Sequence, residues 1–209
     1  MKILKRIHRS HLSKINIWLV AGITLISAGL IFGGIGVISS WLNARHYKVQ
    51  AQGLKNTKPI VTSAPLITGT PTHISIPNVN IDLPVIPGYY YPKDKSWTLT
   101  LDNAQWGTMT SKPNNKEGET YIYAHYRVHV FYTLPKVKSG DLATVTTGNG
   151  HIFTYKFINS TVTVPEDTSL FTYKGKPILV LQTCTGAWYQ YRQLFVFDLV
   201  QVDGKNIKS

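Results

Sequence analysis

The chain has 209 residues, enough for one ordinary domain with additional segments, and its formal net charge is +12. The charge is concentrated near the N-terminus, because nine of the 22 lysines and arginines precede position 60 and the first acidic residue is Asp82. From Asp82 onward 13 basic residues accompany 10 acidic ones, so the predicted folded part lacks the strong basic excess typical of a nucleic-acid-binding domain.

The first part of the chain has the pattern of a membrane anchor. Residues 1–14 are basic without any acid, and the next charged residue is Arg45. As a helix, the uncharged stretch would reach about 45 Å, against a hydrocarbon core of about 30 Å. Trp18 and Trp41 lie near its ends, as in an aromatic belt. We predict a cytoplasmic tail at 1–14, followed by a transmembrane helix.

We place this transmembrane anchor at residues 15–42. A cleaved signal peptide is the alternative, but its apolar core has only about 7 to 15 residues and ends in a small-x-small site. An uncleaved anchor with a basic cytoplasmic end would put the rest of the chain outside the cell membrane. Residues 43–71 are polar and contain three prolines, which is typical of a stalk.

The remainder, residues 72–209, is predicted to be one all-β domain with short strands and frequent turns. Gly148-Asn149-Gly150 is a hairpin signal between two alternating runs. The nearly continuous apolar run from Pro177 to Cys184 is typical of a strand buried on both faces. A barrel or a sandwich would fit, and a closed barrel would remove exposed edges. The expected strands cover 73–76, 79–87, 120–125, 142–147, 151–157, 177–184 and 193–202.

The single cysteine, Cys184, is the first candidate for chemistry. A lone cysteine is often a small buried hydrophobe, but unpaired thiols are unusual outside a membrane unless they are used. A thiol becomes a nucleophile when a neighbour lowers its pKa or takes its proton. If residues 185–191 form a loop between neighbouring strands, Arg192 returns beside Cys184, where it could stabilise a thiolate and an oxyanion.

The candidate proton donor is His125, at the end of the predicted strand 120–125. Each assignment has an alternative. His129 competes for the same role, and His125 could be an ordinary surface histidine. Arg192 could instead pair with Asp198 or Glu119 at a barrel edge.

Together these residues resemble the sortase family. Val180-Leu-Gln-Thr-Cys184 is similar to the family's Thr-Leu-x-Thr-Cys signature, and Ala124-His125 stands where the family usually has Gly-His. Residues 131–141 resemble its Phe-x-x-Leu-x-x-(Leu/Val)-x-x-Gly-Asp stretch, and 74–88 resembles its opening strands. The resemblance covers roughly residues 72 to 203, in the family's order.

The resemblance implies a membrane-anchored cysteine transpeptidase built on a closed eight-stranded β-barrel with short helices. Such an enzyme cleaves a Leu-Pro-x-Thr-Gly (LPXTG) sorting signal between Thr and Gly through a cysteine thioester, which an amine then resolves. By position, Cys184 is the nucleophile, His125 the general acid and later base, and Arg192 the group that orients substrate and stabilises the oxyanion. Thr183 is implied to contact the sorting signal.

The implied partners are secreted surface proteins with C-terminal sorting signals and a cell-wall precursor or another amine, with no nucleic acid. The stalk has no Asp-Pro-aromatic lid and no second membrane segment follows Val202, which favours a housekeeping-like or accessory enzyme over a pilin-polymerising one. Some sortases bind calcium, for which Glu166-Asp167 is the candidate, but a loop pair of acids is more often solvated, so we expect no required cofactor. Residues 188–191 either line the groove or pack on the barrel.

Other cysteine enzymes fit less well. L,D-transpeptidases place an arginine two residues after the cysteine, where this chain has Gly186, and papain-like hydrolases place the cysteine before the histidine. Two alternatives remain, a catalytically silent, membrane-tethered barrel that binds a surface protein or peptide, and a sortase that mainly hydrolyses.

Overall fold

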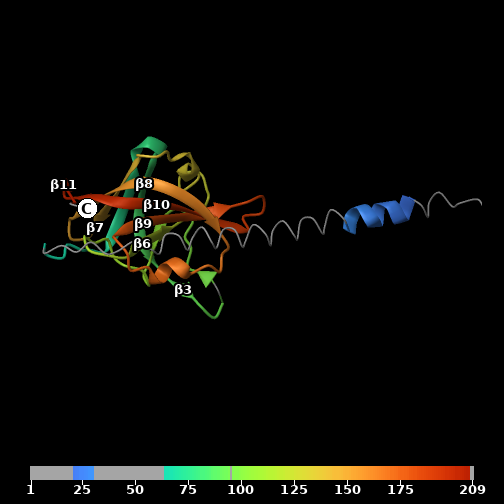
Figure 1. Ribbon diagram of the computed structural model, residues 1–209, viewed down its shortest axis with the longest axis horizontal. Coiled ribbons are helices and arrows are strands. Elements are labelled where there is room, and N and C mark those ends of the chain that lie inside the picture. The colour runs from blue at the N-terminus through green and yellow to red at the C-terminus, as the bar shows by residue number, and fades with distance from the viewer. Residues whose placement is uncertain (1–20, 31–63, 95, 208–209) are drawn as a thin grey trace, which may run out of the picture. The chain divides into compact units, whose positions relative to one another are not determined.

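A computed structural model of the chain describes residues 21–30, 64–94 and 96–207 (Figure 1). The chain divides into two compact units, Met1–Asn43 and Ala44–Ser209. In the first unit, residues 21–30 form a helix with mostly exposed side chains. No helix among the described residues is both long and apolar enough to cross a membrane. Most of the predicted anchor at 15–42, and all of the tail at 1–14, lie outside the described residues.

The second unit consists mainly of strands. Those of the main sheet are β1 (Pro71–Ile76), β2 (Ile81–Gly88), β5 (Ala104–Gly107), β6 (Glu119–Tyr123), β7 (Leu142–Thr147), β8 (Ile152–Thr163), β9 (Ile178–Thr185), β10 (Tyr191–Val202) and β11 (Lys205–Asn206). Strands β3 (Tyr90–Tyr91) and β4 (Ser96–Trp97) form a separate hairpin. The short 3-10 helices are η2 (Pro77–Val79), η3 (Leu134–Lys136) and η4 (Ser169–Thr172).

The main sheet closes on itself. Its strand order is β11-β10-β8-β7-β1-β2-β5-β6-β9, and β9 also pairs with β10, which joins the two ends into a barrel of eight strands with β11 added at one edge. The β2–β5 and β6–β9 pairs are parallel and the other pairs antiparallel. The predicted closed eight-stranded β-barrel is confirmed.

Side chains from alternate strand positions fill the barrel interior, as expected for a barrel of this size. The largest fully buried ones there are Tyr155, Phe131, Phe153, Phe195, Phe197, Ile74, Ile76, Ile81, Ile122, Leu134 and Leu179. A second apolar cluster lies on the opposite face of β6, β9 and β10, and we call it the outer cluster. Its members are Tyr121, Tyr123, Leu170, Tyr173, Ile178, Val180, Leu194 and Val196.

The outer cluster explains why β9 and β6 are buried on both faces. The expectation that β9 is buried on both faces is confirmed for Ile178 to Leu181, whose four side chains alternate between the outer cluster and the interior. The predicted strand at 120–125 is observed as β6, and all five residues of β6 are buried. Its outer face is covered by residues far away in the sequence, including Leu170 in η4.

The segment between β6 and β7 is fixed by core side chains and by one carboxylate. Phe131, Leu134 and Val137 are buried in the barrel core. Gly140 has a φ of +93°, a left-handed conformation that favours glycine. The Asp141 carboxylate then accepts hydrogen bonds from the Lys138 N–H (2.8 Å) and from Asn78 Nδ2 (2.7 Å). These contacts hold the loop that begins at His125.

Candidate active site

Strand pairing brings Cys184, His125 and Arg192 to one place. Arg192 on β10 lies directly opposite Cys184 on β9, so the predicted return of the arginine across a loop is confirmed. Strand β6 runs parallel to β9 with Tyr123 beside Gln182, and the Ala124 N–H donates to the Gln182 carbonyl at 3.1 Å. The same register, continued by two residues, places His125 alongside Cys184.

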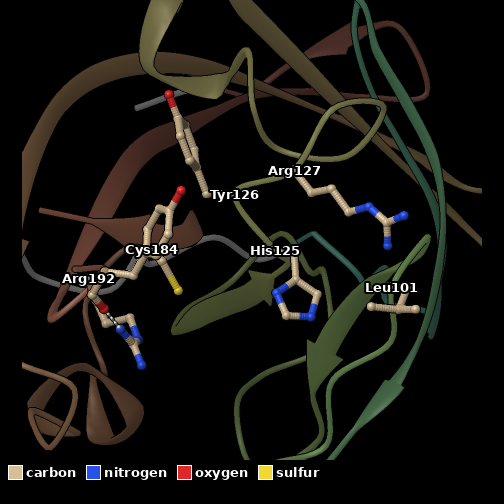
Figure 2. Close-up of a pocket in the computed structure, with 7 residues that line it drawn as sticks. Leu101, His125, Tyr126, Arg127, Cys184 and Arg192 are labelled. Atoms are coloured by element: carbon tan, nitrogen blue, oxygen red, sulfur yellow. Dashed lines mark hydrogen bonds between the residues drawn. The ribbon is translucent and has the colours of Figure 1, made fainter. Parts of the chain in front are cut away.

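These three side chains line one pocket of about 510 Å³ together with Leu101, Tyr126, Arg127 and Tyr189. Figure 2 shows Cys184 between His125 and Arg192, with its sulfur directed into the space that the histidine ring also faces. All three side chains are half-buried. They are therefore reachable from solvent and still held by the fold.

The three residues also share one face of the sheet. Residues two apart on a strand point to the same side. Cys184 follows Val180 by four positions, Arg192 precedes Leu194 by two, and Val180 and Leu194 both belong to the outer cluster. His125 stands in the same relation to Tyr123. The candidate site is therefore on the outer face of β6, β9 and β10, not in the barrel interior.

Thr183 points to the other side. Its side chain is 0% exposed, and its hydroxyl donates to the Ala124 carbonyl at 3.1 Å. The residue does not line the pocket, although the resemblance implied a contact with the substrate. In this structure Thr183 links the end of β9 to the residue preceding His125.

The two candidate histidines differ in their surroundings. His125 lines the pocket, and its carbonyl accepts the N–H groups of Arg127 (2.9 Å) and Phe131 (3.2 Å). Phe131 is fully buried, so it anchors the turn. His129 is exposed, has a φ of +66°, and does not line the pocket.

Arg192 is oriented by the backbone of its own hairpin. Its Nη1 donates to the carbonyl of Tyr189 (3.0 Å) and to that of Tyr191 (3.1 Å). A guanidinium carries five N–H donors, so donors on the other nitrogens can reach a ligand. Asp198, one predicted alternative partner, forms its ion pair with Lys176.

The aromatic loop after Cys184 contributes one side chain to the pocket. Tyr189 lines it, and its ring lies 6.2 Å from that of Tyr126, which in turn lies 5.2 Å from the ring of Tyr132. Trp188 is 86% exposed. Of the two options considered for this loop, lining the groove applies to Tyr189, whereas Trp188 faces solvent.

Sequence reasoning missed Leu101, Tyr126 and Arg127. Tyr126 and Arg127 directly follow His125. Their position in a loop that starts at a candidate catalytic residue could have identified them. Leu101 carries no such signal, because it reaches the pocket from the connection between β4 and β5. Arg127 is 3.9 Å from the carboxylate of Asp102 in that same connection.

Among the described residues, no group of three or more His, Cys, Asp or Glu side chains is placed to hold a metal ion. At the candidate calcium position, the carboxylate of Asp167 accepts hydrogen bonds from Thr163 Oγ1 (2.7 Å) and from the Ser169 N–H (3.0 Å). This carboxylate therefore organises the start of η4.

Comparison with solved structures gives the same architecture. Sortase C1 from Streptococcus agalactiae is 26% identical and has a TM-score of 0.51, over 64% of this chain and 69% of that one. Sortase A from Corynebacterium diphtheriae is 23% identical with a TM-score of 0.52, over 67% and 65%. The SrtA sortase from Actinomyces oris is 17% identical with a TM-score of 0.53, over 69% and 90%.

A comparison with curated proteins finds no match. The sortase domain family model, however, matches residues 74–200, which is more than half of the chain and includes every residue that lines the pocket. This chain belongs to the sortase family.

Proposed function

We propose that this protein is a cysteine transpeptidase that cleaves an LPXTG-type sorting signal between Thr and Gly and transfers the protein to a cell-wall amine. One observation carries the proposal. A thiol on β9, a guanidinium on β10 and an imidazole two residues after the end of β6 line the same pocket. This set provides a nucleophile, a proton carrier and a fixed positive charge, as acyl transfer through a thioester requires.

In the first half-reaction the Cys184 sulfur, as thiolate, attacks the Thr carbonyl carbon. Arg192 stabilises the resulting oxyanion with N–H donors. The C–N bond to glycine then breaks as protonated His125 gives its proton to the leaving amine. The product is a thioester between Cys184 and the Thr carbonyl. The thiolate–imidazolium pair need be only a minor form, since a reactive minority can carry the flux.

In the second half-reaction an amine attacks the thioester carbonyl. His125 takes the proton from the attacking nitrogen, the new C–N bond forms, and the C–S bond breaks to return the Cys184 thiolate. Water in place of the amine would give hydrolysis. The chemical steps are the same for an amine and for water. Transfer to an amine acceptor is therefore itself part of the proposal.

We assign the enzyme to the housekeeping-like or accessory group and place it on the outer face of the cell membrane. The support is in the sequence. Residues 43–71 contain no Asp-Pro-aromatic motif, and residues 15–44 carry no charge. Within that stretch, the helix at 21–30 exposes Leu25 and Ile26, as a helix that lies in lipid would. Fractionation of cells with an antibody against the barrel tests the location.

The decisive experiment uses the full-length protein in detergent and its Cys184→Ala variant. Each is incubated with an LPXTG peptide library, with and without hydroxylamine, and intact-protein mass spectrometry measures the acyl adduct. We expect an adduct on the wild type only, released by hydroxylamine as a hydroxamate. An adduct that persists in Cys184→Ala would contradict the assigned nucleophile.

The same assay separates the alternatives. A silent peptide-binding barrel would give no adduct and a Cys184 thiol that reacts with iodoacetamide no faster than free cysteine. A hydrolytic sortase would form the adduct but release the free acid even when an amine acceptor is abundant. Either result would replace the transfer reaction as the function.

A further inference from the structure

The pocket extends to both sides of His125. Figure 2 shows Cys184 and Arg192 on one side of the His125 ring, and Arg127 and Leu101 on the other. All five residues line the same pocket. In the proposed reaction His125 exchanges a proton with the amine, so the amine nitrogen lies within hydrogen-bond reach of its ring. The group attached to that nitrogen therefore extends away from Cys184, toward Arg127. We call this part of the pocket the amine side.

Arg127 is fixed through its backbone. Its N–H donates to the His125 carbonyl at 2.9 Å, and its own carbonyl accepts the N–H groups of Val130 (3.0 Å) and Tyr132 (3.1 Å). Val130 is only 4% exposed and packs in the barrel core, so it anchors this turn. The Cα of Arg127 therefore keeps a constant position relative to the histidine that handles the proton.

The side chain of Arg127 is available to a ligand. Its Nη1 lies 3.9 Å from the carboxylate of Asp102, beyond hydrogen-bond distance, and the two side chains are 50% and 84% exposed. Such a pair is worth little in water, since solvent screens it. A carboxylate that approaches from the pocket can make two parallel hydrogen bonds to the planar guanidinium and replace Asp102.

The charges around the pocket favour an anionic group. Among the described residues that line it, Arg127 and Arg192 are cationic and none is an aspartate or a glutamate. Arg192 is directed by the Tyr189 and Tyr191 carbonyls and lies next to Cys184, on the other side of His125. Arg127 is thus the cation of the amine side. A cleft lined by charges of one sign attracts ligands of the opposite sign.

We propose that Arg127 is a specificity-determining residue, which exchanges Asp102 for a carboxylate on the amine side of the substrate. This inference rests on the proposed function. The glycine of the sorting signal has no side chain, so the first side chain on the amine side belongs to the residue that follows it. The expected sorting signal therefore continues with an aspartate or a glutamate directly after the glycine.

The acceptor should carry the same chemical group. The second half-reaction is the reverse of the first with a different amine, so the attacking nitrogen takes the position that the leaving nitrogen had. A group attached to the acceptor nitrogen then faces Arg127 in the same way. The expected acceptor is an amino-acid or peptide unit that bears a carboxylate close to its reactive amine.

The test measures charge preference as a ratio. The peptide that gives most adduct in the library experiment is extended after its glycine by either glutamate or glutamine, which are similar in size and differ in charge. The second-order rate constant of Cys184 acylation is measured for both peptides with the full-length wild type, Arg127→Gln and Lys156→Gln in detergent. Because each protein is judged by its own ratio, a general loss of activity in one variant cancels.

Lys156 provides the matched control. It is exposed on β8 and does not line the pocket, so Lys156→Gln removes one positive charge without changing the amine side. We expect the wild type and Lys156→Gln to prefer the glutamate peptide about fivefold, the upper range for a partly exposed ion pair. In Arg127→Gln the ratio should fall to about one, because the only change is the loss of the carboxylate partner.

Three results of this experiment would overturn the inference. They are a wild-type ratio of one or less, an unchanged ratio in Arg127→Gln, and an equal fall of the ratio in Lys156→Gln, which would indicate the overall charge of the protein instead of a contact. Failure of every protein to form an adduct with either peptide would instead overturn the proposed function.

The acceptor half is tested separately. The thioester is formed with one peptide, and the C-terminal amides of glycyl-glutamate and glycyl-glutamine are compared as acceptors by mass spectrometry of the transfer products. The same two acceptors are used with every protein, so any difference in their own basicity cancels between variants. We expect the glutamate acceptor to be preferred by the wild type only. A preference that persists in Arg127→Gln would overturn the shared site.

A further variant leaves Arg127 in place. Asp102→Asn removes the carboxylate that pairs with Arg127 at rest, and the exposure of Asp102 makes a loss of folding unexpected. With this competitor gone, the preference for the glutamate peptide should rise above that of the wild type. A ratio at or below the wild-type value would show that no exchange of carboxylates takes place, and would overturn the inference.

Discussion

His125 and His129 are four residues apart, but only the first faces the thiol. His125 lines the pocket with Cys184, whereas His129 is exposed outside it. We predict that His125→Ala nearly abolishes thioester formation, because His125 is the one imidazole among the described residues that line the pocket, and the proposal assigns it the protonation of the leaving amine. His129→Ala should keep the wild-type rate. Mass spectrometry of the acyl adduct measures both, and the reverse ranking would move the proton-transfer role to His129.

Arg192 is held by two carbonyls of its own hairpin, so its charge is fixed before substrate arrives. We predict that Arg192→Ala lowers the acylation rate by a factor on the order of 10² to 10³, the scale for losing an oxyanion-stabilising donor. Arg192→Lys keeps the charge but lacks the planar donor fork, so its acylation rate should lie between those of the wild type and Arg192→Ala. Rapid-quench kinetics measures the acylation rates of the wild type and the two variants with the peptide that gives most adduct in the library experiment. A loss of less than a few-fold in Arg192→Ala would exclude the role in oxyanion stabilisation.

A stability measurement can separate a structural role of Thr183 from a substrate contact, because its hydroxyl is buried inside the barrel. We predict that Thr183→Val destabilises the fold by about 1 kcal/mol, through loss of the buried hydrogen bond to Ala124 at nearly constant volume. Urea unfolding measures the change. If Thr183 instead contacts the sorting signal, as the resemblance implied, the variant would raise KM and leave the urea midpoint unchanged.

Among the secondary-structure elements, the connection from His125 to β7 depends on one carboxylate. The hydrogen bond from the Lys138 N–H, and then that from Asn78, lower the pKa of Asp141 below its usual value of 3.8. A carboxyl whose pKa is lower in the folded than in the unfolded state adds stability above the unfolded pKa, and this stability is lost as the pH falls through the folded pKa.

We therefore predict that Asp141→Asn lowers the thermal midpoint at neutral pH but not in strong acid. Above the unfolded pKa of 3.8 the wild type keeps the advantage of the ionised carboxylate, and in acid below the lowered folded pKa both proteins carry a neutral side chain. Calorimetry at pH 7 and at about pH 2.5 tests this. An equal difference at the two pH values would show that charge at Asp141 does not stabilise the connection.

The strands themselves show how far local pattern extends. The hairpin at Gly148–Gly150 and the apolar strand β9 follow from turn chemistry and from hydrophobic periodicity, which are local. The burial of both faces of β6 does not follow from local pattern, because Leu170 and Trp97, which cover its outer face, come from other parts of the chain. Alternation in sequence predicts a strand, but only the neighbouring elements decide whether its second face is covered.

The pairing of β9 with β10 closes the barrel, and we expect barrel stability to depend on it. Leu181 on β9 is fully buried and has Ile122 of β6 and Phe195 of β10 as its neighbours in register. We predict that Leu181→Ala costs about 2 to 5 kcal/mol of stability, the usual range for a buried leucine. Leu142→Ala, on the exposed face of β7, should cost little. Urea unfolding of the two variants decides this, and similar midpoints would show that the closure contributes little to stability.

The sequence alone determined the class of fold, the positions of most strands, and the cysteine, histidine and arginine that share the pocket. These depend on residue type, on period and on the order of short motifs, all of which can be read without contacts. The tertiary structure decided that Thr183 points inward, that Leu101 and Arg127 line the pocket, and that Trp97 packs on Tyr121 and Tyr123. Each of these depends on strand register and on packing between distant segments, because a shift of one residue moves a side chain to the other face.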